Sequence, residues 1–389
     1  MRLAVYTDYV YRREDGVIYA ERAFALFLAA LAPHFEQLTL IGRLAPGGDA
    51  RYALPQELKL APLQHYGSLA NPLPALRSLV GSLQQMWRAL DDVDLLWALG
   101  PYPHAIALVL LARIRRRPVV LGVRQDWPRY VRMRHPRSRW MRHAADVMEW
   151  TWMWLARRRR VVAVGAELSA RYAHAPAVLD ITVSLMHRSA IAASAPRPLP
   201  DSELAVLSVG RLDEEKNPLM LADVLALLAA LDPRWRLVVC GEGDLAPALA
   251  HRLKQLGIAD RARLLGYVPM GEALLELYRT SHAMLHVSWT EGFPQVLVEA
   301  FATGLPVVAT AVGGVPAGVG DAALLVAPGH PEAAALALER LLNEPDLRDR
   351  LIAAGLERAQ ALTLEAQIER LASFLAADGR PAQALRAAS

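Results

Sequence analysis

The chain has 389 residues, of which 54% are hydrophobic and 21% charged, and its formal net charge is only +4. This length suits two domains of ordinary size, which invite a cleft between them, and the composition excludes wholesale disorder. The net charge is too small to imply a nucleic-acid partner, and we expect none.

Cysteine usage and the amino terminus indicate the cellular setting. Cys240 is the single cysteine, so it forms no internal disulfide, and its place in the strand-like run RLVVC predicts a buried small hydrophobe. The terminus MRLAVYTDY is typical of a first strand rather than a charged leader, and no run of about 18 apolar residues occurs. We therefore expect a cytoplasmic protein that is neither secreted nor membrane-spanning.

The first half of the chain alternates strand-like and helix-like segments. Short β-branched or leucine-rich runs occupy residues 3–8, 38–43, 95–100 and 118–123, and an Ala/Leu-rich amphipathic segment occupies 20–35. Such alternation predicts βαβ units and a parallel sheet.

The alternation stops at residues 189–202, where small residues and three prolines predict a linker. It then restarts, with strands predicted at 204–212, 235–243, 262–268 and 283–289 and helices at 218–231, 245–257 and 272–281. The predicted fold class is α/β, with two Rossmann-like doubly wound parallel-sheet domains facing a cleft. We place a first domain at 1–190, a second domain at 200–365, and a C-terminal helix at 366–389 packing back on the first domain.

Two glutamates bracket the start of a predicted helix over residues 294–303, which begins at a proline and is followed by glycine. Ligands of open α/β sheets bind beyond the carboxyl ends of strands, and the free N–H groups of a helix start attract phosphate. Glu291 in the loop and Glu299 in the helix suit sugar hydroxyls, so this stretch is interpreted as one wall of a nucleotide-sugar site. The alternative is a helix-start glutamate favoured by the helix dipole and a second, solvated one.

Two cations follow an earlier strand. Gly210 and Arg211 come directly after LAVLSV, and Lys216 follows in DEEKNP. A planar arginine fork and a mobile lysine charge together neutralise a diphosphate without a metal ion. GEGDL, which begins at Gly241, is a further glycine-rich strand-to-helix turn.

Four motifs in order, GRL with KNP, GEGDL, LGYVP, and EGFPQVLVEAFATGLPVVAT with a double glycine, resemble the retaining glycosyltransferases of family four, which have the GT-B fold. The resemblance covers about residues 200–345, and it implies that the second domain, 200–365, binds the nucleotide sugar and that the first, 1–190, binds the acceptor. It implies that Arg211 and Lys216 hold the donor diphosphate, that Glu291 lies by the donor sugar, and that Glu299 bonds the ribose. The other donor-binding residues are Gly210, Gly241, Val268 (by the base), Gly292, Phe293 and Pro294. The chain departs from the family pattern at Pro316-Ala317 and His330, which concerns local loop contacts.

The amino-terminal half matches the family more loosely. Gly16, in TDYVYRREDGVIYAE, is the nearest equivalent of the family's glycine-rich loop. RQDWP resembles the RDxWP loop of members that build polysaccharides or lipid-linked sugars, which suggests acceptor-side roles for Arg124 and Asp126. His104 follows a strand and is a further acceptor-side residue, with a purely structural histidine as the alternative.

One apparent metal motif is set aside. Asp92-Val93-Asp94 matches the DxD pattern that binds a divalent ion in other glycosyltransferases, but it precedes the strand LLWAL and so falls at the wrong edge of the sheet. We therefore expect metal-independent chemistry and no cofactor besides the donor.

These observations predict a retaining hexosyltransferase that moves a sugar from a nucleotide diphosphate sugar to a hydroxyl acceptor in polysaccharide, lipopolysaccharide or glycolipid assembly. A GT-B-like epimerase or phosphorylase and a non-catalytic sugar-nucleotide-binding protein are the alternatives. UDP is favoured as the nucleotide of the donor because the loop after Val268 has no carboxylate immediately placed to pair with guanine, although Glu272 lies near.

Residues 129–160 combine arginine and tryptophan. Ten arginines (129, 132, 134, 137, 139, 142 and 157–160) accompany only two acids, with Trp140, Trp150, Trp152 and Trp154 interleaved. This composition is typical of a surface on an anionic membrane, where each basic residue contributes about 1 kcal/mol. It would bring an acceptor site to a lipid-linked substrate at the inner face of the membrane. Alternatively, Ala144, Val147, Met148, Thr151 and Leu155 pack on the domain and leave a solvated basic face; nucleic-acid binding is disfavoured.

Overall fold

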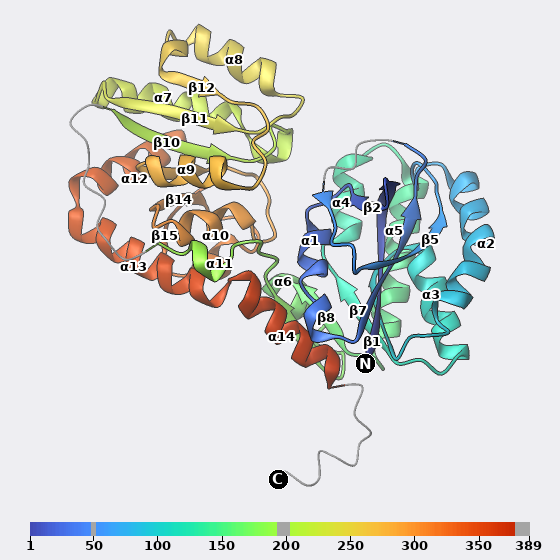
Figure 1. Ribbon diagram of the computed structural model, residues 1–389. Coiled ribbons are helices and arrows are strands. Elements are labelled where there is room, and N and C mark those ends of the chain that lie inside the picture. The colour runs from blue at the N-terminus through green and yellow to red at the C-terminus, as the bar shows by residue number, and fades with distance from the viewer. Residues whose placement is uncertain (48–51, 193–202, 378–389) are drawn as a thin grey trace. The chain divides into compact units, whose positions relative to one another are not determined.

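The computed structural model describes residues 1–47, 52–192 and 203–377 (Figure 1). Its packing divides the chain into two compact units: Met1–Val183 with Gln367–Ser389, and Ser184–Ala366. The boundaries expected from the sequence were 190, 200 and 366. Most of the predicted linker (193–202) and the end of the predicted C-terminal helix (378–389) lie outside the described residues.

The first unit is built on a nine-stranded sheet. Its strands are β1 (Arg2–Glu14), β2 (Val17–Ala20), β3 (Gln37–Leu44), β4 (Tyr52–Ala53), β5 (Lys59–Gln64), β6 (Leu95–Gly100), β7 (Val119–Val123), β8 (Val161–Val164) and β9 (Val178–Ile181). β5, β3, β1, β6, β7, β8 and β9 lie parallel in that order, whereas β2 and β4 are antiparallel additions. β6 and β7 are buried along their whole lengths, as apolar parallel strands are in α/β proteins.

The helices of this unit are α1 (Phe24–Ala29), α2 (Pro72–Ala89), α3 (Pro103–Ile114), α4 (Trp127–Arg134), α5 (Arg139–Ala156), α6 (Ala166–Arg171) and, from Gln367 onward, α14 (Leu364–Ala376). The Arg370 guanidinium donates to the carbonyl of Asp180 at 3.0 Å, and the Gln367 amide oxygen accepts from the Thr182 N–H at 2.9 Å. These bonds attach α14 to the β9 end of the sheet.

The stretch after the first strand is a β-hairpin. β1 continues past the parallel sheet, and Glu14 pairs with Val17 across a two-residue turn in which Asp15 and Gly16 have φ of 48° and 80°. An Asp-Gly pair favours this turn because both residues must adopt positive φ. Gly16 therefore lies at a hairpin tip. The helix predicted over 20–35 was too long, because β2 extends to Ala20 and α1 gives way to a short 3₁₀ turn, Ala32–His34.

The second unit has a six-stranded, entirely parallel sheet. Its strands are β10 (Leu204–Val209), β11 (Trp235–Cys240), β12 (Ala262–Leu264), β13 (Ala283–His286), β14 (Val307–Thr310) and β15 (Ala323–Val326), in the order β12-β11-β10-β13-β14-β15. Its helices are α7 (Leu219–Leu231), α8 (Ala246–Gln255), α9 (Glu272–Thr280), α10 (Gln295–Ala302), α11 (Val315–Val319), α12 (Pro331–Asn343) and α13 (Pro345–Ala361). This is the strand order of dinucleotide-binding domains. The chain adds β11 and β12 on one side of β10 and then β13, β14 and β15 on its other side, so the strand order switches sides between β10 and β13.

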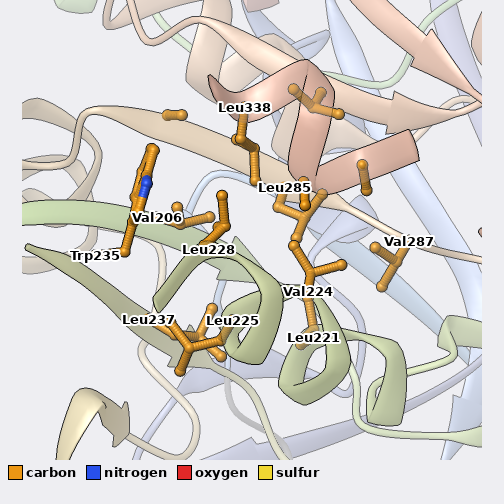
Figure 2. Packing of buried hydrophobic residues seen from close by; sticks show 14 of the residues in the cluster. Val206, Leu221, Val224, Leu225, Leu228, Trp235, Leu237, Leu285, Val287 and Leu338 are labelled. Atoms are coloured by element: carbon orange, nitrogen blue, oxygen red, sulfur yellow. The ribbon is translucent and has the colours of Figure 1, made fainter. Parts of the chain in front are cut away.

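The core of the second unit fixes α7 on this sheet (Figure 2). Leu221, Val224, Leu225 and Leu228 recur at helical spacing on α7 and pack against strand residues that include Val206, Leu237 and Leu285. The indole of Trp235 is buried and its N–H donates to Glu339 at 2.8 Å.

Cys240 is buried, as predicted, and burial raises the pKa of its thiol to about 11. Among the helices of the described ranges, none has both the length and the apolar character that crossing a bilayer requires.

Candidate functional site

The strand reversal of the second unit places the predicted donor residues side by side. A small pocket lies at the carboxyl ends of β10 and β13, where ligands of such sheets bind. Its lining includes Gly210, Arg211, Lys216, His286 and Ser288. The Trp289 N–H donates to the carbonyl of Glu215 at 2.9 Å, which fastens the turn carrying Lys216 (Glu214–Lys216) to the loop after β13.

Glu291 is the centre of this polar cluster. One of its carboxylate oxygens, Oε1, forms an ion pair with Lys216, accepts from the Ser288 hydroxyl at 2.8 Å and lies 3.1 Å from His286 Nε2. Burial alone would raise the pKa of Glu291, but the His286 contact and the Lys216 charge outweigh it and lower the pKa to about 2. Glu291 is therefore ionised at neutral pH.

Arg211 lies beside this cluster on an exposed turn. Its guanidinium forms ion pairs with Asp213 and Glu215. Both carboxylates come from the same turn, so the arginine fork is held at the strand end by partners that an incoming anion would compete with.

Close backbone contacts require glycine around the site. A Cβ at Gly241 would overlap the carbonyl of Gly210, so the turns after β10 and β11 approach each other directly. A Cβ at Gly313 or Gly314 would overlap the carbonyl of Glu291 or Gly292, respectively. The double glycine in the sequence thus lets the loop after β14 pack on the backbone of the glutamate loop.

Glu299 is buried one turn into α10. The Tyr278 hydroxyl donates to its Oε2 at 2.7 Å, and burial raises the pKa of Glu299 despite that bond. Helix α10 begins at Gln295, one residue after its predicted start, so Pro294 is the N-cap and not the first helical residue. The Phe293 ring packs where a Cβ on Gly318 would lie. Val268 lies half-buried in the loop between β12 and α9.

Two of the residues predicted to lie on the acceptor side, His104 and Arg124, follow β6 and β7 of the first unit. His104 is buried, lies 3.1 Å from the Ser78 hydroxyl and stacks on Tyr66, and burial lowers its pKa to about 4. The Arg124 guanidinium lies 3.8 Å from the centre of the Phe24 ring, and burial lowers its pKa to about 10.

Asp126 has structural bonds. Its carboxylate caps α4 by accepting from the Arg129 N–H at 3.1 Å and pairs with Arg171 at 2.6 Å. These contacts account for its position without a ligand.

Two sets of residues near the predicted sites were not predicted from the sequence. His286 and Ser288 position Glu291, and their signal was two polar residues at strand spacing in an otherwise apolar run. In the first unit, Asp8 accepts from the Tyr66 hydroxyl at 2.6 Å, and Arg43 donates to the Asp8 carbonyl at 2.6 Å. Asp8 and Arg43 each follow a buried strand run, so they reach the same sheet edge as His104 and Arg124.

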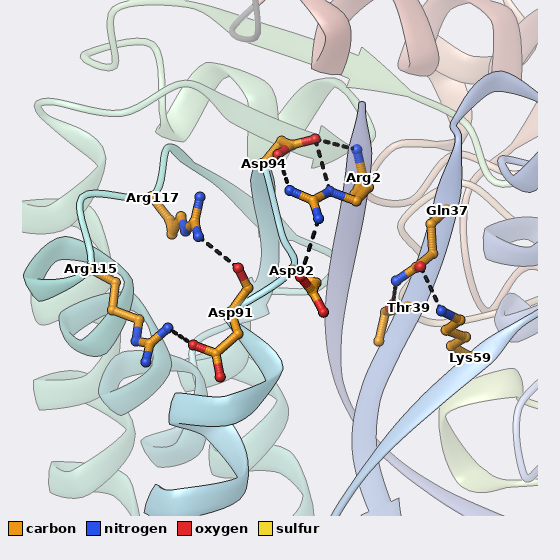
Figure 3. Close-up of polar contacts among 9 residues, drawn as sticks. All are labelled: Arg2, Gln37, Thr39, Lys59, Asp91, Asp92, Asp94, Arg115 and Arg117. Carbon is orange, nitrogen blue, oxygen red and sulfur yellow. Dashed lines mark hydrogen bonds and ion pairs between the residues drawn. The ribbon is translucent and has the colours of Figure 1, made fainter.

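The DxD motif lies at the opposite edge, before β6. Asp94 Oδ1 is 2.9 Å and Asp92 Oδ1 is 3.3 Å from the Arg2 guanidinium (Figure 3). These bonds lower the pKa of Asp94 to about 2, chiefly through the Arg2 side chain. In the part of the chain that the structure describes, no cluster of three or more His, Cys, Asp or Glu side chains suits a metal ion.

The arginine-rich segment 129–160 includes most of α4 and all of α5, and its last four arginines, 157–160, follow α5. α5 buries Ala145, Glu149, Trp152, Leu155 and Ala156, and it exposes Trp140, Val147, Trp150 and Trp154. The packing face considered in the sequence analysis was therefore wrong at Val147, and three of the four tryptophans point to solvent.

The sequence profile of the family Glycosyl transferases group 1 matches residues 192–358. This match lies within the second unit, Ser184–Ala366. The D-inositol 3-phosphate glycosyltransferase of Thermobifida fusca is 38% identical over 184 residues, 44% of this chain and 42% of that protein. The enzyme of the same name from Streptomyces griseus is 39% identical over 175 residues, 42% of this chain and 37% of that protein. The matches thus span about two fifths of these curated relatives.

Solved structures resemble the whole chain. Sucrose-phosphate synthase from Thermosynechococcus elongatus has a TM-score of 0.70 at 19% identity and covers 100% of both chains. Anabaena HepE, solved with UDP and glucose, has a TM-score of 0.69 at 18% identity and covers 97% of this chain and 100% of its own. At such identities the similarity concerns the fold, and with the two parallel-sheet units it confirms the predicted GT-B class.

Proposed function

We propose that the protein is a retaining glycosyltransferase that moves a sugar from a nucleotide diphosphate sugar to a hydroxyl acceptor without a metal ion. The observation that carries this proposal is the group of Arg211, Lys216 and Glu291 at the strand reversal of a glycosyl transferases group 1 domain. That HepE was solved with UDP and with UDP-glucose supports a uridine nucleotide as donor.

The charges match the charge changes of the reaction. When the glycosidic bond to the diphosphate breaks, negative charge grows on the leaving oxygens and positive character on the anomeric carbon. Arg211 and Lys216 stabilise the leaving diphosphate, and the positioned, ionised Glu291 faces the donor sugar. Lys216, His286 and Ser288 all contact Oε1, and no described residue bonds Oε2, which is therefore open to a sugar hydroxyl.

We assign Glu299 to the ribose of the donor and polar residues of the first unit to the acceptor. Glu299 is a buried carboxylate near the start of α10 and would exchange its Tyr278 bond for a ribose hydroxyl. Val268 would lie near the base. The other residues that shape the donor site are Gly210, Gly241, Gly292, Phe293 and Pro294. On the acceptor side we place His104 and Arg124, and we extend the set to Asp8 and Arg43 at the same sheet edge. Gly16, at the hairpin tip, and Asp126 contribute through the loops they shape.

The test is product analysis with a labelled UDP-sugar, with and without hydroxyl acceptors. Transfer predicts acceptor-dependent release of UDP and a product whose anomeric configuration equals that of the donor. Isomerised donor without acceptor would indicate an epimerase instead. Lys216→Ala should lower turnover strongly with little change in melting temperature, whereas Lys254→Ala, an exposed lysine of α8, should change neither. Near-wild-type turnover of K216A at saturating donor would refute the diphosphate assignment.

We further propose that the enzyme works at an anionic membrane surface in polysaccharide, lipopolysaccharide or glycolipid assembly. The exposed Trp140, Trp150 and Trp154 of α5, with Arg134, Arg137 and Arg139 before and at its start, support this placement. Replacing these three arginines by glutamine should weaken binding to anionic vesicles at low salt. Equal recovery of wild type and triple variant in the unbound fraction would contradict the proposal.

A further inference from the structure

Helix α2 carries its large apolar residues on the outside. Leu73, Leu76, Val80, Leu83 and Trp87 recur at three- and four-residue spacing and are between 38% and 67% exposed. The opposite side, which packs on the unit, consists of Ala75, Ser78, Ser82 and Met86. An ordinary surface helix has the reverse arrangement.

Hydrogen bonds fix this orientation. The Ser78 hydroxyl donates to the carbonyl of Gln64 at 2.6 Å, and the Ser82 hydroxyl accepts from the Gln64 N–H at 3.0 Å. Gln64 is the last residue of β5, so both bonds attach α2 to the sheet edge. The apolar stripe points outward because these bonds hold the opposite face of α2 against the sheet.

The neighbouring helix α3 also exposes apolar residues, and the charged side chains of α2 are cations. Leu110 and Ile114 of α3, which packs beside α2, are exposed as well. α2 has no acidic residue, and its two charged side chains are Arg77 and Arg88.

The acids that follow α2 are already paired, Asp92 and Asp94 with Arg2. Asp91, which follows α2, forms an ion pair with Arg115, and Arg117 donates to its carbonyl at 2.7 Å (Figure 3). Arg115 also lies over the ring of Trp87 at 4.1 Å. Within the described ranges, no carboxylate pairs with Arg77 or Arg88.

We propose that the outer face of α2, with Leu110 and Ile114, docks on a lipid bilayer with anionic headgroups. Exposed leucines and a tryptophan flanked by arginines match the interior and the charged surface of such a bilayer. A second copy of the chain fits less well, because a two-fold contact through this face would oppose arginines to arginines.

The same side of the sheet carries α5. Side chains from α2, α3 and α5, among them Met86, Leu108 and Trp152, share one core cluster under the sheet. The outward stripes of α2 and α5 therefore leave the unit on the same side. The α2 inference stands on its own residues and does not depend on the transferase function.

The test is flotation of the full chain with vesicles of phosphatidylglycerol and phosphatidylcholine. The variant Leu76→Gln with Val80→Gln keeps good helix formers on an exposed face, so it should retain the wild-type melting temperature. The matched control is Leu231→Gln with Leu336→Gln, two leucines of the second unit that are 61% and 62% exposed. The α2 variant should bind vesicles at least about tenfold more weakly than wild type, a loss of about 1.4 kcal/mol, whereas the control should bind as wild type does.

Light scattering and a fluorescent label distinguish the other outcomes. A Val80→Cys variant labelled with an environment-sensitive dye should brighten on anionic vesicles, since the native thiol of Cys240 is buried. Wild-type vesicle binding by the α2 variant would overturn the α2 inference alone, because the α5 surface would then account for binding. A wild-type dimer that L76Q/V80Q converts to a monomer would also overturn it, in favour of a second copy.

Discussion

The charged state of Glu291 leads to a pH-dependent prediction. The pKa of this carboxyl lies at about 2 in the folded protein against an ordinary 4.5. A depressed pKa contributes stability that is present above the unfolded-state value and is lost as pH falls toward the folded value. At 1.36 kcal/mol per pKa unit, the contribution at neutral pH is about 3 kcal/mol, and solvent screening is weak because the side chain is only 9% exposed.

The perturbation is Glu291→Gln, which removes the titrating group but keeps its size. Between pH 7 and pH 3.5 the free energy of unfolding of the wild type should fall about 1.4 kcal/mol more than that of E291Q. Urea unfolding at each pH measures this, and the transition of the second unit is recognised as the one that the core substitution Leu225→Ala shifts. Glu357→Gln, an exposed control on α13, should track the wild type. Parallel pH dependences of wild type and E291Q would refute the view that Lys216 and His286 hold Glu291 ionised.

Two further predictions concern stability. Gly313→Ala should lower the free energy of unfolding by at least about 2 kcal/mol and lower turnover, because alanine would have to adopt positive φ with its Cβ against the carbonyl of Glu291. The control Gly67→Ala, where a Cβ meets open space, should change that free energy by less than about 0.5 kcal/mol in urea unfolding. Trp152→Ala should cost about 3–5 kcal/mol in the same assay because the indole is fully buried, whereas Trp154→Ala, half-exposed on the same helix, should cost under about 0.5 kcal/mol; equal losses would contradict the orientation of α5.

Much of the fold was predictable because hydrophobic periodicity is a local property. Helices α7, α8 and α9 begin and end within two residues of their predicted bounds. The β1–β2 hairpin was not predicted, although Asp15-Gly16 is a pair that favours a hairpin turn. The stretch around Gly16 was interpreted as the equivalent of the family's glycine-rich loop instead. Helix α2 was not assigned, since two serines lie on its inward side while its larger apolar residues face outward. Only the bonds to Gln64 show which side faces the sheet.

The site was predictable where residues follow strands directly. Arg211, Lys216 and Glu291 come together because parallel strands end at one edge. His286 and Ser288 were missed because the contacts of a strand residue depend on the direction of the loop that follows it. The Asp8–Arg43 contact joins two strands that are far apart in the chain, so it requires the register of β1 against β3, which single-sequence periodicity does not supply.

The central claim is that the second unit binds a nucleoside diphosphate through Arg211 and Lys216 without a metal ion. Calorimetric titration of UDP in the presence of EDTA into wild type, K216A and K254A tests it most directly. The account predicts binding to wild type and K254A and at least about tenfold weaker binding to K216A, a loss of about 1.4 kcal/mol. Equal affinity of K216A and wild type, or the absence of wild-type heat with UDP, GDP and ADP alike, would contradict it.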